Sequence, residues 1–114
     1  MTKEQMQSCI EACQACAVAC GNCIDGCLSE DNVKMMANCI RLDIDCVNIC
    51  HSTVQFMSVN SQFASEACSL CAKICDACAE ECEKHADMHD HCRKCAEACR
   101  RCAESCREMA SMRN

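Results

Sequence analysis

The stretch CIEACQACAVACGNCIDGC, residues 9–27, decides the fold of this chain, because its cysteines recur in steps of only three and four residues. Side chains at that spacing share one face of an α-helix, since each residue advances the helix by about 100°. A β-strand would instead alternate with a period of two. The stretch therefore predicts a helix with a continuous stripe of thiols that drifts slowly around its axis, as in a left-handed helix bundle.

The same spacing returns in three later parts of the chain. Residues 68–82 and 92–106 repeat the alternating steps, and residues 39–50 keep the grid with fewer cysteines. In this second segment we expect the stripe to continue through four further residues: Met35, Leu42, Thr53 and Met57. A second apolar row, roughly a quarter turn away, would flank the core or meet another subunit. It consists of Met36, Ile40, Ile44, Val47 and Val54.

Polar residues separate the four segments and offer helix caps. The predicted caps are Asp31 or Asn32, Asn60 or Ser61, and Asp87. We predict helices over residues 3–28, 32–57, 61–85 and 88–111. Connections this short make consecutive helices antiparallel neighbours. The expected fold class is therefore all-α, an antiparallel up-down-up-down four-helix bundle with cysteines lining the core, forming a single domain over residues 1–114.

Composition excludes several other classes of protein. The chain has 114 residues, 19 of them Cys, with two Phe and no Pro, Trp or Tyr, which suits neither a β-sandwich nor a barrel. A hydrophobic content of 51% argues against disorder, and a net charge of -6 argues against a nucleic-acid partner. No apolar run reaches the roughly 20 residues of a membrane span, so no membrane partner is expected. The first residues lack the apolar core of a secretory signal, which predicts a cytoplasmic protein with reduced thiols.

A core of thiols indicates metal binding. Cysteine buries little apolar area, so such a core needs another source of stability, and metal binding to the folded state would supply it. Neighbouring cysteines on one helix face can reach a shared ion. Structural zinc sites use turns or knuckles and iron–sulfur motifs use loops, whereas soft thiolates select Cu(I).

Charge favours Cu(I) as well, without excluding zinc. One Cu(I) per thiolate leaves the core about neutral, whereas Zn²⁺ held by four unshared thiolates leaves about two negative charges per site. We therefore expect many Cu(I) ions per chain, on the order of one per cysteine or about 15–20. The predicted ligands are Cys9, Cys13, Cys16, Cys20, Cys23, Cys27, Cys39, Cys46, Cys50, Cys68, Cys71, Cys75, Cys78, Cys82, Cys92, Cys95, Cys99, Cys102 and Cys106.

The two ends of the predicted bundle differ in composition. One end gathers imidazoles and thioethers, which bind Cu(I) more weakly than thiolates and so suit transient entry. We predict His89 and His91 as metal ligands there, and His85, Met35 and Met88 as further residues at the metal entry. At the opposite end, Phe56 and Phe63 are expected to help close the core. His51 lies off the cysteine stripe and receives no role.

Three other functions remain open at this stage. The first is a zinc- or cadmium-binding buffer similar to metallothionein, and the second is a thiol redox enzyme that uses CxxC pairs. A copper chaperone is the third, although it would need one exposed site. We find no nucleophile–base pair and no glycine-rich phosphate loop, so no catalytic residue is predicted and we expect a protein that is not an enzyme.

The repeated CxxxCxxCxxxC pattern, together with the His-Asp-His-Cys run at 89–92, resembles the bacterial cytosolic copper storage proteins. This resemblance implies a bundle filled with thiolate-bound Cu(I), a homotetramer, and a storage or buffering role that keeps Cu(I) from toxic chemistry. The exported branch of the family carries a twin-arginine leader and a Met-rich mouth. Histidines at the mouth and no leader make this chain similar to the cytosolic branch. The proteins that donate or accept copper stay unspecified.

Overall fold

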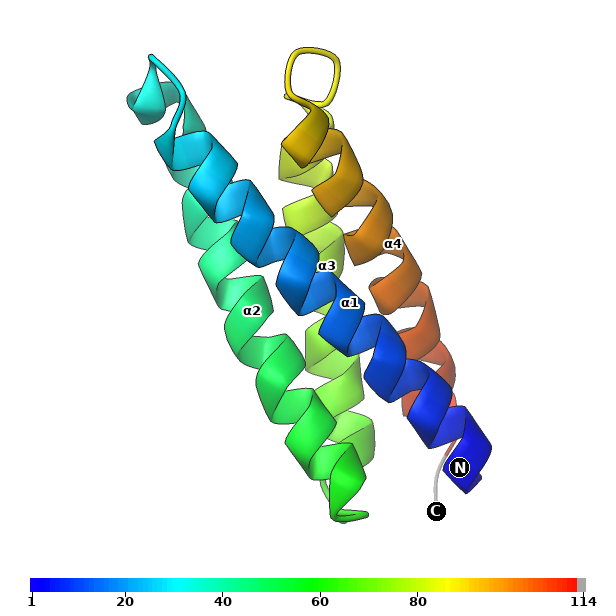
Figure 1. Ribbon diagram of the computed structural model, residues 1–114. Helices are drawn as coiled ribbons and strands as arrows, with labels where there is room; N and C mark the ends of the chain where they lie inside the picture. The colour runs from blue at the N-terminus through cyan, green and yellow to red at the C-terminus, as the bar shows by residue number, and fades with distance from the viewer. Residues whose placement is uncertain (113–114) are drawn as a thin grey trace.

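The computed structural model describes residues 1–112, which form four α-helices (Figure 1). They are α1 (Lys3–Leu28), α2 (Ala37–Ser58), α3 (Ala64–Glu83) and α4 (Asp90–Ser111), with a short 3-10 helix η1 (Val33–Met36) before α2. The described residues contain no strand. They form a rod with principal extents of 47 × 19 × 17 Å. None of the helices in this described part combines the length and apolarity needed to cross a lipid bilayer.

Each helix packs against two neighbours around a common axis. α1 lies between α2 and α4, and α3 lies between the same two helices on the opposite side of the core. One end of the rod carries the α1–α2 and α3–α4 connections, while the other carries the α2–α3 connection and both chain termini (Figure 1). The predicted antiparallel up-down-up-down bundle is confirmed.

Helix boundaries match the prediction for α1 and differ for the other three helices. Thr2 caps α1: its Oγ1 accepts a hydrogen bond from the Gln5 backbone N–H at 3.0 Å, and Gln5 Oε1 accepts from the Thr2 N–H at 2.8 Å. α2, α3 and α4 begin later than predicted, after Met36, Phe63 and His89, and none has a side-chain cap. Turns and the 3-10 helix take up the residues between the polar cap candidates and the helices.

The buried stripe of α2 corrects two predicted residues. Met35 and Leu42 do not lie on it; Met36 is 2% exposed and Asp43 is fully buried in their place. A 3-10 helix turns by about 120° per residue rather than 100°, so η1 brings Met36 and not Met35 toward the core. Thr53 and Met57 are buried as predicted.

The closed end of the bundle differs from the prediction as well. Phe56 and Phe63 are 37% and 51% exposed, so they do not plug the core. Met57, Met109 and Thr53 are buried there instead. Thr53 satisfies its hydroxyl by donating to the Ala67 carbonyl oxygen at 3.4 Å. Small and flexible side chains on the stripe therefore close this end, and the aromatic rings stay at the surface.

Candidate metal centre

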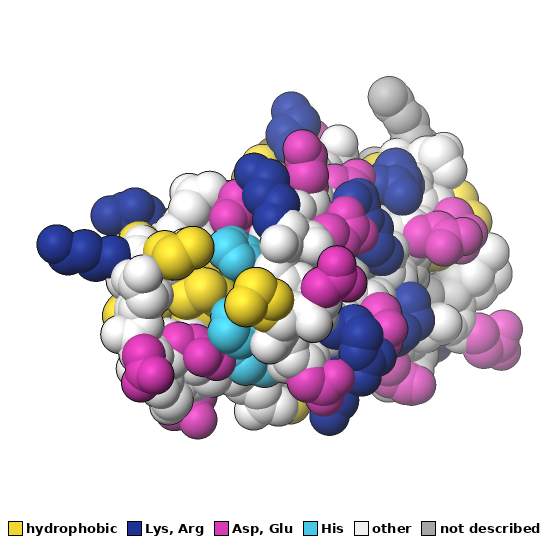
Figure 2. Space-filling model, turned by 90° about the horizontal axis from the view of Figure 1, so that it is seen from above, with side chains coloured by type: hydrophobic (Ala, Val, Ile, Leu, Met, Phe, Trp, Pro, Cys, Tyr) yellow, Lys and Arg dark blue, Asp and Glu magenta, His cyan; other side chains and the backbone are white. Residues whose placement is uncertain are grey.

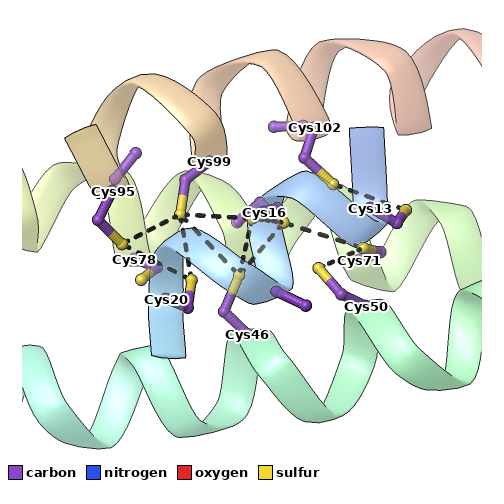
Figure 3. Close-up of a cluster of buried hydrophobic side chains, with 14 of the residues drawn as sticks. Cys13, Cys16, Cys20, Cys46, Cys50, Cys71, Cys78, Cys95, Cys99 and Cys102 are labelled. Atoms are coloured by element: carbon purple, nitrogen blue, oxygen red, sulfur yellow. Dashed lines mark hydrogen bonds between the residues drawn. The ribbon is translucent and has the colours of Figure 1, made fainter. Parts of the chain in front are cut away.

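All 19 cysteines have 0% exposure, and all are free thiols. The four helices turn their stripes toward one axis, and Figure 3 shows the sulfur atoms of residues such as Cys16, Cys46 and Cys99 pointing toward one another from different helices. Leucine or isoleucine would fill this position in an ordinary bundle. The core is a column of sulfur instead.

The sulfur atoms are close enough to share ions. Sγ–Sγ distances between helices include 3.4 Å for Cys39 and Cys82, 3.5 Å for Cys46 and Cys75, and 3.6 Å for Cys13 and Cys102. These distances are far longer than the roughly 2.05 Å of a disulfide. The thiols are therefore arranged for coordination or hydrogen bonding rather than joined as cystines.

The thiols form overlapping groups of four. Within each group, all four sulfurs lie within 4.8 Å of one another, and five such groups are Cys13/Cys71/Cys102/Cys106, Cys16/Cys46/Cys50/Cys75, Cys16/Cys20/Cys46/Cys99, Cys20/Cys78/Cys95/Cys99 and Cys23/Cys27/Cys39/Cys92. Four cysteines, Cys16, Cys20, Cys46 and Cys99, each belong to two of these five groups. A thiolate that belongs to two groups can bridge two ions, so the column suits a chain of linked metal sites.

Burial opposes the ionisation of core thiols in the metal-free protein, whereas hydrogen bonds from neighbouring thiols favour the thiolate at some of them, such as Cys102, whose pKa they lower. Removal from water raises the pKa of the Cys27 thiol to about 12, because the charged thiolate is poorly solvated in the core. A metal ion must displace the proton of a thiol such as Cys27 when it binds there, because the thiolate is the ligand.

One carboxyl group interrupts the sulfur column. Asp43 is fully buried, and its Oδ1 accepts hydrogen bonds from the thiols of Cys78 at 3.1 Å and Cys95 at 3.2 Å. Cys82 contacts the same oxygen at 3.8 Å, and Cys39 contacts Oδ2 at 3.8 Å. Burial, reinforced by Cys95 and Cys78, raises the pKa of Asp43 to about 11. The metal-free core thus holds a neutral carboxylic acid at pH 7.

Three histidines gather at the end with the α1–α2 and α3–α4 connections, beside hydrophobic and acidic side chains (Figure 2). His91 reaches deepest, with its Nδ1 3.6 Å from the Cys23 sulfur and 3.5 Å from the Cys92 sulfur. His89 stacks on it, with ring centroids 5.4 Å apart. The prediction that His89 and His91 share the mouth is consistent with this geometry.

Carboxylates hold the histidine rings. Glu30 Oε1 lies 3.0 Å from His91 Nε2 and 3.1 Å from His89 Nδ1. The hydrogen bond from His91 holds the pKa of Glu30 below its usual value, so this carboxylate is ionised at pH 7. On the other side of the mouth, Glu81 Oε2 lies 3.2 Å from His85 Nε2.

The predicted thioethers do not reach the core. Met35 is 66% exposed and Met88 is 83% exposed, because Met88 lies in the turn before α4 rather than on its stripe. His51 is exposed on α2, away from the mouth, as its position off the stripe predicts.

Sequence reasoning missed Asp43 and Glu30. The sequence does indicate that Asp43 is buried, because residues 39, 43, 46 and 50 follow the same steps of three and four as the cysteines. The sequence gives no such indication for Glu30, since its contacts depend on how the chain turns after α1.

A helix bundle with a column of free thiols in its core is typical of one class of protein, which binds soft metal ions through clustered thiolates. Comparison with known families narrows this class. The copper storage protein family matches residues 2–111, and the chain belongs to that family.

Three solved structures are similar over nearly the whole chain. The Cu(I)-bound copper storage protein BsCsp3 is 49% identical, with a TM-score of 0.88, and the match covers 93% of this chain and 98% of that one. Apo copper storage protein 3 from Bacillus subtilis is 50% identical (TM-score 0.85; 91% and 97% covered). A cytosolic copper storage protein from Streptomyces lividans, solved with five coppers, is 43% identical (TM-score 0.91; 97% and 96% covered). The comparison with curated proteins gave no match.

Proposed function

We propose that this chain stores and buffers Cu(I) in the cytosol, with many ions per chain and no catalytic turnover. The observation that carries the proposal is the continuous column of buried thiols with overlapping groups of four. A chaperone needs one exposed site and a redox enzyme needs one reactive pair, whereas here every thiol is buried among several others. Such a core suits the storage of many ions rather than the transfer of one ion or the catalysis of a redox reaction.

Cu(I) fits this core better than Zn²⁺ does. Shared thiolates allow one monovalent ion per cysteine, which leaves the buried column about neutral. Zn²⁺ held by four unshared thiolates would leave about two negative charges per site beside the buried Asp43 carboxyl. We therefore propose Cu(I) as the cargo and all 19 cysteines as its ligands.

Metal analysis under competition tests the cargo. Metal-free protein loaded anaerobically with equal amounts of Cu(I) and Zn²⁺ should retain mostly Cu(I) after desalting. A product that retains mainly zinc would instead support the metallothionein-like alternative. A thiol titration of the same metal-free sample should find nearly all 19 thiols free; one defined disulfide would support the redox alternative.

We propose that ions enter at the histidine end. His91 lies against Cys23 and Cys92, and the partly buried His89 ring stacks on it. The partly buried His85 ring lies at the same end of the bundle, beside Glu81. Met35 and Met88 are exposed thioethers at the same end, where they would meet an ion before the thiols do.

Replacement of His85, His89 and His91 together by Ala tests this entry route. Cu(I) uptake should slow by ~10-fold or more, while the number of ions bound changes little, because the cysteines supply the capacity. His51→Ala is the matched control, since that histidine lies away from the mouth. Unchanged uptake in the triple variant would overturn the entry route.

We further propose that the chain assembles with copies of itself, as a homotetramer by its family resemblance. Exposed apolar side chains support an assembly, among them Ile44, Phe56, Phe63 and Leu70. Light scattering coupled to gel filtration tests this, with a mass near four times 12.6 kDa expected and a monomer mass contradicting it.

A further inference from the structure

Glu30 lies just after α1, and one of its oxygens contacts two histidines. Oε1 is 3.0 Å from His91 Nε2 and 3.1 Å from His89 Nδ1. An ionised carboxylate can only accept hydrogen bonds, so His91 Nε2, which is hydrogen-bonded to it, carries a proton. In a neutral imidazole the other nitrogen then holds a lone pair. For His91 that nitrogen is Nδ1, the atom that faces the sulfurs of Cys23 and Cys92.

We propose that Glu30 is a positioning residue of the entry site: it fixes His91 in the tautomer and orientation that aim the Nδ1 lone pair at Cys23 and Cys92. The proposal rests on the Cu(I) storage function given above. It makes His91 Nδ1 and the two sulfurs a preformed three-ligand site for the first ion. That site adjoins the group Cys23, Cys27, Cys39 and Cys92, into which the ion can move.

Gly26 supplies the space that this arrangement needs. A Cβ atom at residue 26 would lie 2.6 Å from both Cγ and Cδ2 of His91, closer than non-bonded carbon atoms approach. The His91 ring can therefore lie over the last turn of α1 only because residue 26 has no side chain. Glu30 holds one edge of the ring, and Gly26 leaves room for its face.

The contribution of Glu30 is orientation rather than attraction of the cation. Partners that orient a metal-binding histidine typically contribute 10–100-fold to metal affinity or activity. Without Glu30, the imidazole can carry its proton on Nδ1 or turn away from the sulfurs. The first ions would then find fewer preformed ligands and enter more slowly, while the capacity of the cysteine column stays the same.

Three variants separate orientation from charge. Glu30→Ala removes the acceptor, whereas Glu30→Gln removes the charge and keeps an amide oxygen in the place of Oε1, the one atom that both histidines use. Glu80→Ala is the control, because Glu80 is an exposed glutamate on α3. Two quantities are measured for each: the stopped-flow rate of uptake of the first Cu(I) equivalent from a chromophoric chelator, and the tautomer of His91 in metal-free protein by ¹⁵N–¹H correlation NMR.

We expect Glu30→Ala to slow the first uptake by ~10-fold and to populate the Nδ1–H tautomer of His91. Glu30→Gln should restore most of the rate and the Nε2–H tautomer, and Glu80→Ala should match the unmodified protein. An Nδ1–H tautomer in the unmodified protein, an unchanged rate in Glu30→Ala, or equal slowing in Glu30→Gln and Glu30→Ala would overturn the positioning role. A chain that takes up no Cu(I) at all would overturn the storage function instead, and the tautomer measurement would still decide the role of Glu30.

Discussion

The two halves of the thiol column come from the same repeated spacing but carry different chemistry. In the closed half, sulfur atoms contact almost only sulfur, and Thr53, Met57 and Met109 seal the end; its cysteines are Cys9, Cys13, Cys16, Cys46, Cys50, Cys68, Cys71, Cys75, Cys99, Cys102 and Cys106. In the entry half, the sulfurs also meet the Asp43 carboxyl and the His91 ring; its cysteines are Cys20, Cys23, Cys27, Cys39, Cys78, Cys82, Cys92 and Cys95. The carboxyl and imidazole groups that contact the column thus lie in the half where we propose that ions enter.

This difference assigns a separate task to each half. An all-sulfur environment with no solvent access favours retention of a soft ion. Weaker nitrogen ligands, held at the mouth by Glu30 and Glu81, favour rapid capture and release. The account therefore expects changes in the closed half to alter capacity or stability, and changes in the entry half to alter rates and pH dependence.

The largest effect is expected from removing sulfurs in the closed half. Replacement of Cys16, Cys46, Cys75 and Cys99 by Ser should remove about four Cu(I) ions per chain, since capacity is on the order of one ion per cysteine. The rate at which the first ion enters should stay the same. The matched variant in the entry half replaces Cys23, Cys39, Cys82 and Cys92, and it should lose similar capacity and also slow the first uptake. Identical kinetics in the two variants would remove the distinction between the halves.

The buried side chains at the end of the closed half should contribute to the free energy of unfolding. Met57→Ala leaves a cavity at a residue that is 2% exposed, and such core truncations cost about 2–5 kcal/mol of unfolding free energy. Phe56→Ala is the control at the neighbouring, partly exposed residue, and it should cost clearly less. Chemical denaturation of the metal-free proteins measures both. A larger loss for Phe56→Ala would indicate that the aromatic ring closes the end after all.

Asp43 should make the stability of the metal-free protein depend on pH. The folded protein keeps its proton up to a pKa of about 11, whereas the unfolded chain releases it near a pKa of about 4. Because the folded state binds more protons between these values, the stabilising contribution is complete below about pH 4 and falls as pH rises, by at most about 1.4 kcal/mol per unit.

Asp43→Asn should therefore flatten the fall in unfolding free energy between about pH 5 and about pH 8. Asp45→Asn, at an exposed residue of the same helix, should leave that fall unchanged. Chemical denaturation of metal-free protein across this range measures the slopes. Equal slopes in the two variants would contradict a protonated Asp43 in the folded core.

The smallest effect is expected at the mouth. Gly26→Ala should push the His91 ring away from Cys23 and Cys92 and slow the first uptake of Cu(I) several-fold. Gly21→Ala is the matched control on the same helix, because a Cβ at that residue meets no atom within 4 Å. Both changes favour helix formation by up to about 1 kcal/mol, so neither should unfold the protein. A similar uptake rate in both would show that the ring position is unimportant for entry.

The bundle itself was predictable because the cysteine steps report helix period and buried face together. Asp43 shows the limit of that reasoning, since the steps from Cys39 to Cys46 can pass through residue 42 or residue 43, and hydrophobicity favoured Leu42. Spacing alone could not decide which of the two residues is buried. A buried carboxyl group costs free energy unless it is hydrogen-bonded, and the thiols that bond to Asp43 are visible only in the structure. The prediction that Met35 lies on the buried stripe was wrong for another reason: the 3-10 helix η1 changes the helical register just before α2.

The mouth was predictable in composition but not in detail. His89 and His91 come before or at the start of α4, where the sequence already gathers polar ligands. Their link to Glu30 depends on the turn after α1, which brings together residues about 60 positions apart in the chain. No periodic pattern encodes such a contact, whereas every core cysteine follows one.

Anaerobic titration of the metal-free chain with Cu(I), against a chromophoric Cu(I) chelator, tests the central claim most directly. If the buried sulfurs act together as one column of bridged sites, the protein should outcompete the chelator until about 15–20 ions are bound per chain. Saturation after only one or two ions would mean that the column does not act as a store, and would contradict the account.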